Sequence, residues 1–194
     1  MQLSNSNTQS RTTIIALIAI AILSILVRTV PALHLWPNFS PIGALALFSG
    51  ALFWNKKWMF VIPVGAMSAS DTIKEITAPG TGFYPDMVYV YASFFAIILL
   101  GMIIKNTKRP LSILGASIAG SVLFFLVTNF GAWMMNNPTS FIIYTRNFSG
   151  LIACYASGIP FFKYTLFSDL LFNGVFFGGY YLLSANSSVK TTVA

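Results

Sequence analysis

The sequence predicts an all-α integral membrane protein, a bundle of six transmembrane helices. Of its 194 residues, 56% are hydrophobic and only 8% are charged, whereas a soluble domain carries about 25% charged residues. Long apolar runs are separated by short polar connections, and the Lys and Arg residues lie at the ends of these runs. Cations in that arrangement are topology signals, so the net charge of +7 does not indicate a nucleic-acid partner.

The first predicted span is Thr13–Val27. Arg11 precedes it, as a cation precedes the apolar region of a signal peptide. Arg28 follows directly, without a small-residue cleavage site, which favours a retained helix. We therefore expect a disordered cytoplasmic tail at residues 1–12 and a single transmembrane domain at 13–185. A second polar tail is expected at residues 186–194.

The next two runs, Ile42–Trp54 and Trp58–Met67, are short and are separated by "NKKW". This pattern predicts a helical hairpin with a tight turn. Met87–Ile104 and Leu111–Met135 follow as the fourth and fifth predicted helices. An upright span needs about 20 apolar residues, a length that Leu111–Met135 exceeds.

The last two runs are Phe148–Phe162 and Tyr164–Ala185. The first would be about 22 Å long as a helix, shorter than the roughly 30 Å hydrocarbon core. We therefore expect a short extra helix packed in the last outer loop and a sixth span at Tyr164–Ala185. If the short segment crosses instead, the chain has seven spans and an outside C-terminus. Small residues suited to close helix packing form one stripe on it: Gly150, Cys154, Ser157 and Gly158.

The charge distribution orients the bundle with both termini in the cytoplasm. In the six-span arrangement seven cations lie inside and four outside, the direction of the positive-inside rule. The inside group is Arg11, Lys56, Lys57, Lys105, Lys108, Arg109 and Lys190, and the outside group is Arg28, Lys74, Arg146 and Lys163.

A polar face on the fifth helix is the first candidate binding feature. Asn129, Trp133 and Asn136 are spaced i, i+4 and i+7, which places them on one side of a helix. We expect this face to line a cavity open to the outside. Asn129 bonding to a neighbouring helix and Trp133 anchoring at the membrane interface are the structural alternatives.

Two buried acids are the second candidate feature. Asp169 and Asn173 share a face at i, i+4, and Asp71 ends the third helix at a comparable height. A carboxylate inside a membrane costs about 2.5–3.5 kcal/mol, so it normally faces a partner or water. Ligand contact is one interpretation. An ion pair between Arg146 and either acid is the other.

The outer connections at residues 28–41, 68–86 and 136–163 carry most of the remaining polar residues. Three prolines stiffen the first connection. The residues we single out in these loops as possible ligand contacts are His34, Asn38, Tyr144 and Arg146. For His34 an ordinary surface position is the alternative.

Motifs for catalysis and for cofactor binding are missing from the sequence. It contains no HExxH, no Gly-x-Ser-x-Gly and no phosphate-binding loop, and it has one histidine and one cysteine. We therefore expect no enzyme activity, no metal and no cofactor. Active transport would depend on another subunit or another energy source.

Three stretches carry a family resemblance: "PNFSPIGALALFSGALF", "FFLVTNFGAWMM" and "GLIACYASGIPFFKYTLFSDLLFNGVFFGGYYL". Over residues 37–183 the chain resembles a widespread bacterial family of small uncharacterised membrane proteins. In size and loop layout it is similar to the substrate-binding S components of energy-coupling-factor (ECF) vitamin transporters, and most similar to stand-alone cobalamin uptake proteins. The resemblance implies an S-component fold in the bacterial inner (cytoplasmic) membrane. It also implies a vitamin-type ligand bound from outside, and an energising transporter module as a further partner.

Two functions follow from these observations. The first is binding and uptake of a small molecule, with cobalamin as one possible ligand. The second is a non-transporting membrane subunit or assembly factor whose outer loops hold a partner protein. A cavity near Asn129 and Asp169 would favour the first function, and a flat apolar patch with mutually paired polar groups would favour the second.

Overall fold

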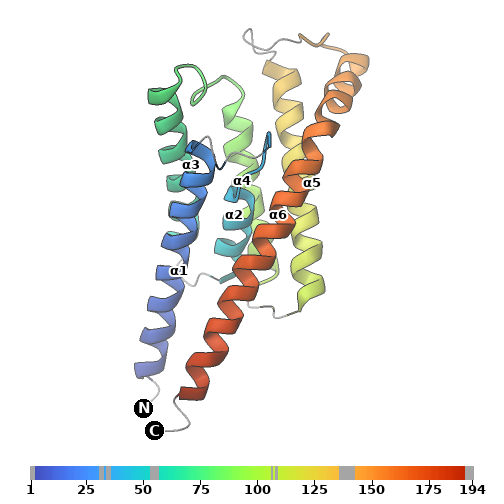
Figure 1. Ribbon diagram of the computed structural model, residues 1–194. Helices are drawn as coiled ribbons and strands as arrows, with labels where there is room; N and C mark the ends of the chain where they lie inside the picture. Colours follow the sequence, from blue (N-terminus) through green and yellow to red (C-terminus); the bar gives the residue numbers. More distant parts are fainter. Residues whose placement is uncertain are drawn as a thin grey trace.

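The structure is a computed structural model that describes residues 3–30, 33, 36–52, 57–105, 107, 109–135 and 143–190. This part of the chain is all-helical, without a strand (Figure 1). Its helices are α1 (Leu3–Thr29), α2 (Ile42–Leu52), α3 (Trp58–Thr77), α4 (Met87–Ile103), α5 (Pro110–Met135) and α6 (Phe148–Lys190).

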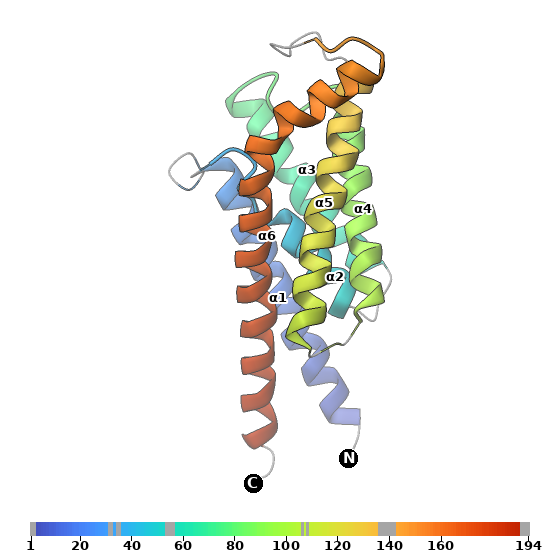
Figure 2. The ribbon, with the colours of Figure 1, turned by 90° about the vertical axis from the view of Figure 1, so that its right-hand side faces the viewer.

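The short helix α2 is the centre of the bundle. Its 11 residues extend only about 16 Å, and it contacts each of the other five helices (Figures 1 and 2). The chain before it is already inside the protein, since Phe39 is only 5% exposed. The Ser168 hydroxyl of α6 fixes this approach by accepting from the Ser40 amide at 3.0 Å and donating to the Ser40 carbonyl at 2.8 Å.

Close contact between α2 and α4 depends on two glycines. A Cβ at Gly50 would overlap the carbonyl oxygen of Ile98, and a Cβ at Gly101 would overlap that of Leu47. The backbones therefore approach more closely than larger residues would allow, as small residues permit in helix pairs.

Apolar side chains cover the outside of the bundle. Large exposed hydrophobics occur on every described helix except α2, for example Ile15 (67%), Ile103 (80%) and Leu111 (81%). Among the described residues one helix, Pro110–Met135, is both long and apolar enough to cross a membrane. Shorter apolar helices of the described residues are Ile14–Thr29, Ile42–Leu52 and Met87–Ile103.

The helix boundaries agree with the sequence for α4 and α5 and differ elsewhere. The third helix continues past the apolar run Trp58–Met67 to Thr77. The first helix begins at Leu3 and the last reaches Lys190, so helical structure enters both stretches that we expected to be tails. The predicted turn between α2 and α3 falls largely on residues 53–56, outside the described residues.

The expected short extra helix in the last outer loop is wrong. Phe148–Phe162 and the following run form one continuous helix, α6, of 43 residues. Proline inside a helix removes one hydrogen bond and bends it, and Pro160 lies within α6, whose upper part leans away from the rest (Figure 2). Because the chain does not reverse direction, the two runs cannot be two separate crossings.

Candidate functional site

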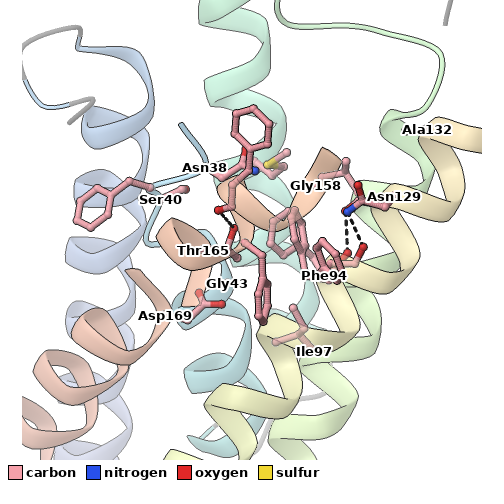
Figure 3. Close-up of a pocket in the computed structure, with 18 of the residues that line it drawn as sticks. Asn38, Ser40, Gly43, Phe94, Ile97, Asn129, Ala132, Gly158, Thr165 and Asp169 are labelled. Carbon is pink, nitrogen blue, oxygen red and sulfur yellow. Dashed lines mark hydrogen bonds between the residues drawn. The ribbon is translucent and has the colours of Figure 1, made fainter. Parts of the chain in front are cut away.

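A cavity of about 330 Å³ lies in the upper half of the bundle, and all six helices contribute to its wall (Figure 3). Phenylalanine dominates the apolar part of the lining. These residues are Phe39, Phe94, Phe124, Phe125, Phe161 and Phe162.

Polar groups are distributed among these rings. The cavity is lined by Asn38, Thr128, Asn129, Thr165 and Asp169, together with Arg28, Lys74, Tyr84 and Asp86. Small-molecule sites usually combine such an apolar wall with a few fixed polar groups.

Asn129 lines the cavity, as its helical face predicted. Its Nδ2 donates to the Phe125 carbonyl of its own helix at 2.8 Å, and the expected alternative, a side-chain bond to another helix, is not present among the described residues. A Cβ at Gly158 would overlap Asn129 Oδ1. The glycine on α6 therefore makes room for the amide, and the side chain is held in one orientation.

Asp169 also lines the cavity and is only 5% exposed. Its Oδ2 lies 2.7 Å from the Ser121 hydroxyl of α5. On the other side it lies against the first turn of α2, where a Cβ at Gly43 would overlap Oδ1. Partial positive charge at a helix N-terminus favours an acid in this position.

Asn173 follows one turn deeper on α6 and is 2% exposed. Its Nδ2 donates to the Ser117 hydroxyl at 2.9 Å, whereas its buried Oδ1 has no hydrogen-bond partner among the described residues. Asp169 and Asn173 thus share a face, as predicted, and that face meets Ser117 and Ser121 of α5.

Asp71 is buried behind the cavity wall instead of lining it. Arg28 Nη2 pairs with Asp71 Oδ1 at 2.5 Å, and the Tyr91 hydroxyl donates to Oδ2 at 3.0 Å. The expected pairing of an acid with Arg146 is therefore wrong for Asp71, and the partner that the structure gives Asp169 is Ser121. The reason is that α1 packs on α3, which brings Arg28 to Asp71.

The expectation that Trp133 shares the lining with Asn129 is also wrong. Trp133 Nε1 donates to the Thr145 carbonyl at 3.0 Å, so this side chain holds residues 143–147 over the end of α5. Tyr144 is half-buried and Arg146 is exposed in that same segment. His34 and Asn136 lie outside the described residues.

The prediction from sequence missed several lining residues. Arg28 and Lys74 looked like topology signals, yet both face the cavity. The phenylalanines looked like ordinary membrane residues. One available signal was the pair Ser117 and Ser121, whose i, i+4 spacing in an apolar helix resembles that of Asp169 and Asn173.

Tyr84, in the connection between α3 and α4, contributes a neutral phenol to the cavity. Burial raises the pKa of Tyr84 to about 12, and the nearby Asp71 carboxylate acts in the same direction. Its hydroxyl therefore keeps its proton at physiological pH and can donate a hydrogen bond.

The fold and the cavity define a class: a small all-helical protein with a polar, aromatic-lined cavity at one end of a bundle whose outer surface is apolar. The chain belongs to a family of unknown function, DUF6580, whose model matches residues 6–191. No curated protein and no solved structure matches the chain.

Proposed function

We propose that this protein crosses the membrane several times and binds one small molecule from the outer side for uptake. The observation that carries the proposal is the shared cavity, since Asn129 and Asp169 come from different helices and line the same space. The sequence singled out both residues from independent spacings.

The proposed membrane arrangement has six crossings, with both termini in the cytoplasm. The apolar exposed faces of the outer helices support it, because such surface is unfavourable in water. The start of α1 and the end of α6 lie at the end of the bundle away from the cavity (Figure 1). Single cysteines at Ser188 and Thr81, in a Cys154→Ala background, test this orientation. Labelling of Ser188→Cys from outside intact cells would contradict it.

The cavity favours a compact ligand with an apolar or aromatic body. A volume of about 330 Å³ is near the lower end of the roughly 300–1,000 Å³ typical of small-molecule sites. A corrinoid, with its macrocycle and nucleotide tail, is too large for it, so we favour a smaller molecule over cobalamin. Arg28 Nε is buried at the cavity wall and has no partner in the described part of the chain, which favours a hydrogen-bond acceptor on the ligand.

Ligand extraction with a cavity-filling variant tests the proposal. Ala132 lines the cavity (Figure 3), whereas Ala92 is exposed on α4. We expect wild type and Ala92→Trp to co-purify with the same compound, identified by mass spectrometry, and Ala132→Trp to lose it. Equal recovery from both variants would show that the compound is not held in the cavity.

The alternative of a partner-binding subunit makes a different prediction. Its expected mutual pairing of polar groups is partly present, since Asp71, Asp169 and Trp133 all have protein partners. The cavity among them is the feature that this alternative does not require. Wild-type protein without any enriched small molecule would leave the subunit function as the better interpretation.

A further inference from the structure

Asp169 is a buried acid without a countercharge among the described residues. Helix α6 packs on α1, α2 and α5. Helices α2 and α5 contain no ionisable side chain, and Arg28 at the end of α1 is engaged by Asp71. Lys163 on α6 itself is exposed and lies over the Tyr164 ring. The remaining ionisable groups of the cavity wall are Lys74, Tyr84 and Asp86, on α3 and the connection that follows it.

An ionised carboxylate in this position is unfavourable, because removing an ion from water is costly unless a partner compensates, and the partial charge at the α2 N-terminus compensates only in part. A bound proton removes the charge. A metal ion between the acid and its neighbour is less suited, because Oδ2 and the Ser121 hydroxyl are already only 2.7 Å apart.

The hydrogen bonds of Ser121 favour the protonated acid. Its hydroxyl oxygen lies 2.7 Å from Asp169 Oδ2 and 3.1 Å from the Ser117 carbonyl. A hydroxyl has one proton to donate, and both of these neighbours are acceptors when Asp169 is ionised. If Asp169 carries a proton, it donates to Ser121, Ser121 donates to the Ser117 carbonyl, and both contacts are full hydrogen bonds.

We propose that Asp169 is a proton-binding site at the base of the cavity and that its proton drives uptake, which rests on the function proposed above. In each cycle one O–H bond forms at Asp169 from a proton of the outer water. That bond breaks when the proton is released to inner water, leaving the carboxylate. No electron is transferred, and the proton gradient supplies the energy for uptake.

The residues beneath Asp169 are consistent with a proton route toward the other side of the membrane that is closed in this conformation. One turn deeper, Asn173 has a buried Oδ1 that no described residue contacts with a hydrogen bond, and this oxygen can accept from a proton donor or a water. Below it the rings of Phe48, Phe176 and Phe177 contact one another and are buried. The proton would therefore exchange with the cavity in this state and with the other side only after α6 moves relative to α2.

Infrared titration of the full-length protein in lipid bilayers tests the site without a ligand. The probe is the proton, and the signal is the C=O stretch of a protonated carboxylic acid. We expect one such band in wild type that disappears at alkaline pH. It should be missing in Asp169→Asn and retained in Glu75→Gln, which removes a half-buried acid that does not line the cavity. If Asp169→Asn does not fold, Ser121→Ala is the second variant.

Ser121→Ala should keep the band, since it removes a hydrogen-bonding neighbour of the acid and leaves the Asp169 carboxyl group itself in place. A band that persists in Asp169→Asn, or one that never titrates while the protein is folded, would overturn the proposal. Loss of the band on adding Na⁺ at constant pH would also overturn it, in favour of a sodium site. The titration is independent of ligand extraction, so each proposal can fail alone.

Discussion

Asp71 on α3 and Asp169 on α6 are buried to a similar extent, 2% and 5% exposed, but their partners differ in kind. Asp71 is paired with the Arg28 guanidinium, which also donates to the Met67 sulfur at 2.9 Å. Asp169 is bonded to a neutral hydroxyl. The first arrangement holds two charges in place, whereas the second leaves an acid free to change its charge. The comparison separates a structural acid from a candidate functional one.

Breaking the Arg28–Asp71 ion pair should cause the largest loss of stability. Arg28→Leu leaves the Asp71 carboxylate buried without a cation, which we expect to destabilise the protein by about 3–5 kcal/mol. Thermal unfolding in detergent measures this. The double variant Arg28→Leu, Asp71→Leu should be more stable than Arg28→Leu alone. Additive losses in the double variant would show that the two residues do not act as a pair.

A steric change beside Asp169 should cause the next largest loss of stability. Gly43→Ala places a Cβ where Asp169 Oδ1 now lies, so the carboxylate must move. Overpacking of this kind costs about 1–3 kcal/mol. Gly65→Ala is the matched control, because a Cβ at Gly65 meets nothing within 4 Å. Equal unfolding temperatures for the two variants would contradict the close contact.

Neutralising Asp169 and Asp71 in turn should destabilise the protein to different extents. Asp169→Asn keeps the size and the neutral charge of a protonated acid, so we expect a loss of no more than about 1 kcal/mol. Asp71→Asn leaves Arg28 buried without its partner and should lose at least twice as much. Thermal unfolding in detergent compares the two variants. A larger loss of stability in Asp169→Asn than in Asp71→Asn would mean that Asp169 is ionised in the folded protein.

The smallest effect should come from replacing Glu75, whose carboxylate is hydrogen-bonded to backbone amides and not to another side chain. Its carboxylate accepts from Gly80, Gly82 and Phe83 at 3.0, 3.1 and 3.2 Å. These bonds lower the pKa of Glu75 below its usual value, and the bond from Gly80 has the largest effect. The stabilisation is therefore present above the ordinary glutamate pKa and is lost as pH falls through the lowered one.

Hydrogen exchange at the amides of residues 80–83 measures this local effect. We expect faster exchange in Glu75→Gln than in wild type at neutral pH, with no change at Asp169 or α6. Identical exchange in the two proteins would show that Glu75 does not hold the connection between α3 and α4.

The candidate site was partly predictable because local spacing follows from helix geometry. Asn129 and Asp169 were found from i, i+4 patterns in apolar runs, and the cavity includes both. Trp133 was misplaced because its partner, Thr145, lies beyond the end of the helix. Of the predicted small-residue stripe, Cys154 and Gly158 pack on α5, where Cys154 donates to the Asn129 carbonyl at 3.3 Å, whereas Ser157 is exposed.

The sequence by itself determined the apolar helices and which polar residues share a face. These properties depend on composition and on the helical period, both of which are local. Only the tertiary structure decided that α2 is the buried centre, that Arg28 is the partner of Asp71 and that Phe148–Phe162 continues into the last helix. Each depends on which helices pack together. A residue's nearest partner can be 43 positions away, as for Arg28 and Asp71, and periodicity carries no information at that distance.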